Sequence, residues 1–335
     1  MIRFLIFLSF FGLYSMDRFC QKSSCATCIR QLKAKWCLGS VSANQKQVAQ
    51  DTLYDYCYRK NSGAKVFIYF FCSGVNNHDD FKDQYTGQSR IINGQNYITN
   101  EDFADTSPSF ICSSIASVAI GTKYGTAKHA QLVNVKVADK TGYGDVSLMI
   151  SGYKWTMEDC AKRRQVEAKA RCVILFTPFK AQNDELDNLS IQAYNAGILS
   201  VSGCNNANAS CCGDSVCGVK ETLSVATTTM KNKKYTGVRS NYGPCLDIYA
   251  PGYNCLTAYA DGTNMNQTIN YGSTQHSSAY AAGCVANYLS FYPQSSCSQA
   301  KNFILDNALE GVIENVPPNT PNKYLHCPCC SFSEQ

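Results

Sequence analysis

The sequence has few charged residues, and those present are not clustered. Charged side chains make up 16% of the 335 residues, against about 25% in an average soluble protein. The formal net charge is +5 at pH 7, and the lysines and arginines are spread along the chain. Nucleic-acid-binding proteins usually concentrate basic residues in a patch or stripe, so the composition argues against nucleic acid as a partner.

Beyond its first residues, the chain also lacks an apolar run long enough to span a membrane, which takes about 18 residues or more. Residues 1–15, MIRFLIFLSFFGLYS, combine an early arginine with a short apolar run and then small or polar residues. This pattern is typical of a secretory signal peptide and is too short for a membrane helix. We expect a secreted or cell-surface protein with no membrane span after signal removal.

Histidine is scarce, with four in the chain, and this limits both metal binding and proton transfer. Cys25 and Cys28 have the spacing of half a zinc site, but no second Cys/His pair follows at zinc-finger spacing. We therefore expect no metal and no other cofactor.

Cysteine, in contrast, is abundant, and in an oxidising compartment disulfide bonds are its default use. The spacing does not fix which cysteines pair. The disulfide candidates are Cys20, Cys25, Cys28, Cys37, Cys57, Cys72, Cys112, Cys160, Cys172, Cys204, Cys211, Cys212, Cys217, Cys245, Cys255, Cys284, Cys297, Cys327, Cys329 and Cys330. Three N-x-Ser/Thr sequons, at Asn188, Asn208 and Asn266, are candidate glycosylation sites and agree with secretion.

The two ends of the chain differ in composition from its middle. Residues 16–35 form a short cysteine-rich segment, for which a local disulfide knot is the favoured interpretation. Residues 317–335 are rich in proline and cysteine, which predicts an extended linker anchored by disulfides. Intermolecular disulfides from this tail are the alternative. Residues 36–316 are left as the main domain.

The middle of the chain alternates between two kinds of pattern. Residues 66–75, VFIYFFCSGV, form a continuous apolar run that is typical of a strand buried on both faces. Similar runs occur at 131–137, 172–176, 198–202 and 222–227, with helical stretches between them at 113–120, 145–158 and 185–196. Residues 277–290 predict a further, buried helix because small residues dominate there. The alternation predicts an α/β fold: a three-layer αβα, doubly wound, mostly parallel sheet, with ligand sites at the carboxyl ends of the strands.

Several segments resemble, in order, those of subtilases of the proteinase K type. Residues 111–137 are similar to the family segments HGTHCAGTVG and YGVAKKTQLFGVKV, and 239–252, RSNYGPCLDIYAPG, to FSNYGSVLDIFGPG. Residues 66–75 resemble the first strand with its Asp-Thr-Gly turn, and 271–292 the motif GTSMATPHVAGLAAYL. The resemblance covers about residues 36–316 and implies a subtilisin-like domain there.

The family cleaves peptide bonds with an Asp-His-Ser triad and an oxyanion-hole asparagine. In this sequence the resemblance places the triad positions at Cys72, Ile111 and Gln275, and the oxyanion position at Cys204. Asn205, one residue further on, is the one rescue for the oxyanion position. Since none of these four residue types performs the family's chemistry, the resemblance implies an inactive member, a pseudoprotease.

Alternatives remain open at these positions. Cys72, Cys112 and Cys204 would form a disulfide among themselves, stay inert thiols, or supply a reactive thiol. His276 follows Gln275 and would enter the cleft, and Pro178 removes a backbone donor from the edge that binds substrate in the family.

Three functions follow. The favoured one is a secreted, inactive structural or binding subunit of an extracellular assembly, whose partners are other extracellular proteins or copies of itself. The others are a hydrolase with relocated catalytic residues and a protease regulator that holds peptides in the degraded cleft.

Overall fold

The computed structural model describes residues 28–43, 54–177, 182–229, 240–263, 265–269 and 273–329. The predicted signal peptide, Pro178, Cys20, Cys25 and Cys330 lie outside these ranges. Among the described residues, no helix is both long and apolar enough to cross a membrane.

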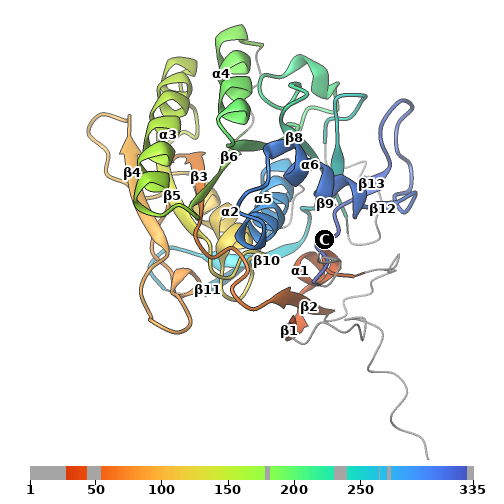
Figure 1. Ribbon diagram of the computed structural model, residues 1–335, viewed down its shortest axis with the longest axis horizontal. Helices are drawn as coiled ribbons and strands as arrows, with labels where there is room; N and C mark the ends of the chain where they lie inside the picture. The colour runs from red at the N-terminus through yellow and green to blue at the C-terminus, as the bar shows by residue number, and fades with distance from the viewer. Residues whose placement is uncertain are drawn as a thin grey trace, which may run out of the picture.

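A nine-stranded sheet forms the centre of the molecule (Figure 1). Its strand order is β12-β13-β9-β8-β7-β6-β3-β5-β4. Neighbouring strands run parallel except at β12–β13. The strands are β3 (Val66–Cys72), β4 (Ile91–Asn96), β5 (Gln131–Lys136), β6 (Arg171–Phe176), β7 (Leu199–Gly203), β8 (Leu223–Thr228), β9 (Ile248–Pro251), β12 (Leu309–Glu310) and β13 (Lys323–Tyr324).

Helices cover both faces of this sheet. One layer contains α2 (Ile111–Ile120), α5 (Thr274–Phe291) and α6 (Cys297–Asp306), and the other contains α3 (Val146–Val166) and α4 (Asp184–Asn195). Side chains of β3 alternate between the two: Ile68 and Phe70 belong to the core beneath α2 and α5, whereas Tyr69 and Phe71 belong to the core beneath α3. The predicted three-layer, mostly parallel fold is confirmed.

The predicted buried helix at 277–290 is the inner part of α5, which lies against α2 and several strands. Its small residues allow close approach. A Cβ added at Gly283 would lie 1.8 Å from Thr126 Oγ1 and 2.9 Å from the backbone oxygen of Ala119. Glycine is therefore required where α5 crosses the end of α2.

The first and last described segments of the chain lie together and pack against the main domain. A hairpin of β1 (Cys28–Ala34) and β2 (Tyr54–Arg59) and the short helix α1 (Trp36–Ser40) occupy one flank (Figure 1), near a second hairpin of β10 (Cys255–Tyr259) and β11 (Met265–Ile269). In the tail, Tyr324 of β13 pairs with Tyr249 of β9. The main sheet therefore extends beyond the predicted domain end at residue 316.

The expected local knot near the N-terminus is not what the described cysteines form. Cys28 is bonded to Cys329 and Cys37 to Cys255, across 301 and 218 residues of sequence. The reason is spatial. Strand β1 pairs with β2 and helix α1 packs against β10, so Cys28 and Cys37 lie beside segments that are distant in sequence. The tail is anchored by a disulfide, as predicted, and Cys329 forms that bond within the chain.

Most other candidate cysteines are bonded, but four are not. The remaining described pairs are Cys72–Cys112, Cys160–Cys172, Cys204–Cys211 and Cys212–Cys245, and Cys57 is also disulfide-bonded. In this structure Cys217, Cys284, Cys297 and Cys327 are buried free thiols, so the predicted disulfides are not confirmed for these four. All four lie in hydrophobic clusters, where a thiol packs as a small apolar group.

Candidate functional site

The four positions that the resemblance assigns to catalysis lie on the elements expected to meet at one edge of the sheet. Cys72 ends β3 and Cys204 follows β7, while Ile111 begins α2 and Gln275 lies in the first turn of α5. Carboxyl ends of parallel strands share one edge. A Cβ at Gly203 would lie 2.7 Å from the backbone oxygen of Thr274, so the end of β7 directly abuts the start of α5.

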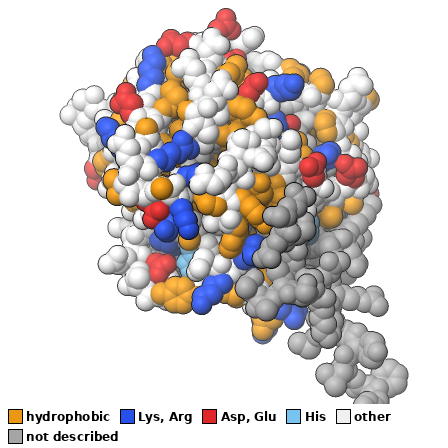
Figure 2. All heavy atoms as spheres, viewed as in Figure 1, with side chains coloured by type: hydrophobic (Ala, Val, Ile, Leu, Met, Phe, Trp, Pro, Cys, Tyr) orange, Lys and Arg blue, Asp and Glu red, His pale blue; other side chains and the backbone are white. Residues whose placement is uncertain are grey.

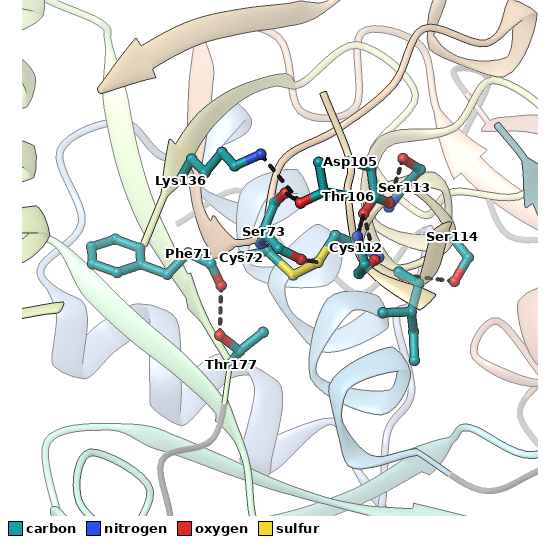
Figure 3. Close-up of a disulfide and its surroundings, with 12 residues drawn as sticks. Phe71, Cys72, Ser73, Asp105, Thr106, Cys112, Ser113, Ser114, Lys136 and Thr177 are labelled. Carbon is teal, nitrogen blue, oxygen red and sulfur yellow. Dashed lines mark hydrogen bonds between the residues drawn. A yellow bond between two sulfur atoms is a disulfide. The ribbon is translucent and has the colours of Figure 1, made fainter. Parts of the chain in front are cut away.

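Cys72 is held in a disulfide with Cys112 in the first turn of α2 (Figure 3). Both residues are buried, with 5% and 2% of their surface exposed. The backbone nitrogen of Ser73 lies 3.3 Å from Cys112 Sγ, and the Ser73 hydroxyl lies 3.1 Å from the same atom. The sequence left a disulfide, an inert thiol and a reactive thiol open for Cys72, and the structure contains the disulfide. It leaves no thiolate at this position for nucleophilic attack.

The start of α2 is also fixed by a buried carboxylate. Asp105 accepts hydrogen bonds from the backbone nitrogen and hydroxyl of Ser113, both at 2.7 Å (Figure 3). It also accepts hydrogen bonds from the backbone nitrogen and hydroxyl of Ser107. Burial raises the pKa of Asp105, and these hydrogen bonds partly oppose that rise. The carboxylate therefore serves as an anchor for the helix N-terminus, where a negative charge is favoured.

Cys204 is disulfide-bonded to Cys211, and the next residue, Cys212, is disulfide-bonded to Cys245. Asn205, the proposed rescue for the oxyanion position, is 5% exposed and has φ 55°. Its neighbour Asn206 is the residue that faces α5. Asn206 Nδ2 donates to Gln275 Oε1 at 3.2 Å, and Asn206 Oδ1 accepts from the Thr274 nitrogen at 3.2 Å.

Gln275 is fixed by local contacts. Its Oε1 accepts from Asn206 and also from the hydroxyl of Ser273, at 2.6 Å. A carboxamide has no nucleophilic atom comparable to a serine oxygen or a thiolate, and here its oxygen is engaged twice. Sequence reasoning identified Gln275 but missed Asn206, because its role depends on which of two adjacent asparagines turns toward the helix.

Sequence reasoning also missed a contact between Ser114 and His276, which lie in the first turns of α2 and α5. The Ser114 hydroxyl is 2.8 Å from His276 Nε2, and both residues are buried. The same hydroxyl donates to the Ile111 carbonyl oxygen at 2.8 Å. A hydroxyl carries one proton, so His276 Nε2 must be the donor to Ser114. With its proton on Nε2, His276 cannot act as a base toward Ser114.

His276 is neutral at ordinary pH. Burial lowers its pKa to about 3. Its Nδ1 atom is buried without a hydrogen-bond partner, whereas a triad histidine uses Nδ1 to contact an orienting carboxylate. Ile111 is half-buried and packs against the core. No group of three or more His, Cys, Asp or Glu side chains suited to a metal ion occurs in the described ranges.

The asparagines of the three predicted sequons lie at the surface. Asn188 lies on α4, Asn208 in the loop after β7 and Asn266 on β11, and all three asparagines are exposed. Asn266 Oδ1 accepts a hydrogen bond from the hydroxyl of Tyr124. Glycosylation itself stays a prediction at all three.

Comparison with known proteins agrees with this architecture. The profile of the subtilase family matches residues 63–325. A subtilisin-like protease 2 of Trichophyton rubrum is 27% identical over 303 residues, which cover 90% of this chain and 68% of the relative. An extracellular serine proteinase of Thermus sp. (strain Rt41A) is 30% identical over 303 residues, covering 89% and 67%. Other curated relatives are covered over 55–64% of their length.

A solved structure is also similar. The crystal structure of a cold adapted subtilisin-like serine proteinase superposes with a TM-score of 0.75 and 25% sequence identity. The match covers 90% of this chain and 100% of that one.

Proposed function

The chain belongs to the subtilase family, and from that premise we propose that it is a secreted, catalytically inactive member that serves as a structural or binding subunit of an extracellular or cell-surface assembly. One observation carries the proposal. At the positions assigned to catalysis, Cys72 and Cys204 are consumed in disulfides, and the oxygen of Gln275 is engaged by Ser273 and Asn206.

The size of the expected loss supports inactivity. In subtilisin, removing the catalytic serine or histidine alone lowers kcat by about 10⁶, roughly 8 kcal/mol of activation free energy. The activity that then remains depends on the oxyanion hole, whose asparagine position is Cys204 in this chain. None of the four assigned positions keeps the residue type that would supply part of the catalytic rate.

A role outside the cell is supported by the disulfides and by the relatives. Six described disulfides would be unusual in a reducing cytosol. One relative is named an extracellular proteinase.

The surface suits protein partners better than nucleic acid. Acidic and basic side chains are interspersed on the face drawn in Figure 2. Tyr85 and Tyr143 are 66% and 81% exposed, and tyrosine is favoured at recognition surfaces. We propose other extracellular proteins or copies of this chain as the partners.

Activity-based labelling tests inactivity. The purified, disulfide-intact protein is incubated with a fluorophosphonate probe and separately with iodoacetamide, beside an active subtilase as the positive control. We expect stoichiometric fluorophosphonate labelling of the control alone and no rapidly alkylated thiol in the native protein. One-to-one labelling of this chain at a single residue would sink the proposal. Measuring the size of the native protein purified from its source tests whether it is part of an assembly. A freely diffusing monomer would contradict that part of the proposal.

One observation favours a second candidate, a hydrolase with relocated catalytic residues: the 2.8 Å contact between Ser114 and His276. The proton on Nε2, the lack of a partner for Nδ1 and the burial of both residues weigh against it. If fluorophosphonate did label the protein, loss of the label in Ser114→Ala and its retention in Ser117→Ala would support this candidate.

A further inference from the structure

Two of the buried free thiols come from segments far apart in sequence and meet each other. Cys284 lies in the middle of α5 and is 1% exposed, and Cys327 lies in the tail and is 7% exposed. Both side chains line the same small cavity, beside Tyr56 and Asn287. Asn287 Nδ2, one turn along α5, also lies 3.7 Å from Cys327 Sγ.

The backbone on both sides of this contact is held in place. The Leu325 nitrogen donates to the Tyr249 carbonyl oxygen at 2.7 Å, and the Cys327 nitrogen donates to the Val41 carbonyl oxygen at 2.5 Å. Two residues later, Cys329 is bonded to Cys28. These bonds fix the position of Cys327, so the fold itself brings the two cysteines to one cavity.

The other two free thiols provide a contrast. Cys217 directs its thiol to the carbonyl oxygens of Cys211 and Asp214, at 3.6 and 3.8 Å. Cys297 begins α6, and Arg164 is the charged group that acts on it. Burial raises the pKa of Cys217, Cys284 and Cys297, to about 12 for Cys297, so all three are poor nucleophiles at neutral pH while they are buried. The contrast lies in the neighbours, because Cys217 and Cys297 do not line the cavity that Cys284 and Cys327 share among the described residues.

We propose that Cys284 and Cys327 are joined by a further disulfide in the mature protein, which ties the C-terminal tail to the central helix α5. The oxidant is a disulfide of an oxidoreductase or of a small thiol. One cysteine attacks it, forming a mixed disulfide and releasing one thiol. The second cysteine then attacks the mixed disulfide and releases the other thiol.

The exchange balances. Two S–H bonds and the oxidant's S–S bond are lost, and one S–S bond and two thiols on the oxidant are formed. Because both sulfurs are buried once the tail is seated, the exchange takes place before the tail closes over α5. The tail is then bonded at Cys327 to the core and at Cys329 to the β1–β2 hairpin.

Thiol counting with matched variants tests the pairing. Wild type, Cys284→Ala and Cys217→Ala are produced in an oxidising secretory compartment, denatured without reductant, and titrated for thiols. With the disulfide present, Cys284→Ala frees Cys327, so its count rises by one relative to wild type. Cys217→Ala removes a free thiol, so its count falls by one. A fall of one in Cys284→Ala would overturn the proposal.

Disulfide mapping of the wild type keeps the test valid even where a variant fails to fold. Free thiols are alkylated under denaturing, non-reducing conditions, the protein is digested, and linked peptides are identified by mass. We expect a peptide pair that joins Cys284 to Cys327. Alkylation of both cysteines, or a link from either one to a different cysteine, would refute the pairing.

Discussion

The two helix layers of this molecule cover the same sheet but are built differently. Helix α3 buries five of its 21 residues, and its outer face meets solvent. Helix α5 buries 14 of its 18 residues, because α2, α6 and the sheet surround it. Polar groups in the α5 layer therefore depend on partners inside the protein. His276 Nε2 and Asn287 Nδ2 have such partners, whereas His276 Nδ1 and Asn287 Oδ1 are buried without one.

This difference bears on the candidate site, because two of its four positions lie in the buried layer. The start of α2 and the start of α5 carry Ile111 and Gln275, so the positions assigned to catalysis depend on packing in the buried layer. The α3 and α4 layer supports the sheet from the other side. We expect substitutions in the buried layer to have large effects and substitutions on the exposed faces of α3 and α4 to be tolerated.

The largest expected effect is the loss of the disulfide that joins α2 to the sheet. Cys72→Ala with Cys112→Ala opens a link across 40 residues, while Cys160→Ala with Cys172→Ala in the α3 layer opens one across 12. Loop-closure entropy predicts losses in unfolding free energy of about 4 and about 3 kcal/mol, respectively. Urea unfolding of both double variants measures this order. A larger loss from the α3 pair would show that loop entropy does not govern these bonds.

Overpacking between α2 and α5 should come next. Gly283→Leu places carbon atoms against Thr126 and the Ala119 backbone, which should cost about 3 kcal/mol. Ala161→Leu, at an exposed position of α3, should change stability by less than about 0.5 kcal/mol. Thermal and urea unfolding compare the two. Similar effects for both would remove the distinction between the layers.

Buried His276 predicts a stability loss in acid. Its folded pKa is about 3, below about 6.5 in the unfolded chain. The unfolded state thus binds more protons between these values, and stability falls as pH falls through them. Lowering the pH from 7 to 5 should cost about 2 kcal/mol from this residue.

The variant His276→Met isolates that contribution. Urea unfolding of wild type and variant is measured at pH 7 and pH 5. The wild type should lose more unfolding free energy than the variant when the pH is lowered. An equal pH dependence in both proteins would mean that His276 is not kept neutral by burial.

The central strands β3, β5, β6, β7 and β8 and the helices α2 to α5 were predictable because local patterns determine them. The run at 66–75 is apolar on both faces, and β3 is buried on both sides. The small residues of 277–290 likewise indicated the burial of α5. The short strand β13 was missed, since its pairing with β9 depends on the tail being anchored at Cys329.

The candidate site was predictable by residue but not by contact. The resemblance gave Cys72 and Gln275 as positions. The partner of Cys72 required knowing that α2 begins beside the end of β3, and the partner of Gln275 required the backbone turn at Asn205 with φ 55°. The contact between Ser114 and His276 joins residues 162 apart in sequence, and no spacing rule relates them.

The smallest expected effect lies on the outer layer, in the ion pair between Lys154 of α3 and Glu185 of α4. The charged atoms are 2.9 Å apart, but the side chains are 55% and 58% exposed. Water screens such a pair, and ordering two long side chains costs entropy, so the coupling energy should be about 0.2–1 kcal/mol. A double-mutant cycle with Lys154→Ala and Glu185→Ala measures it, at low and at high salt. Because solvent reaches both groups, added salt should reduce the coupling further. A coupling well above 1 kcal/mol that is insensitive to salt would mean that the outer layer is held by specific contacts as the α5 layer is.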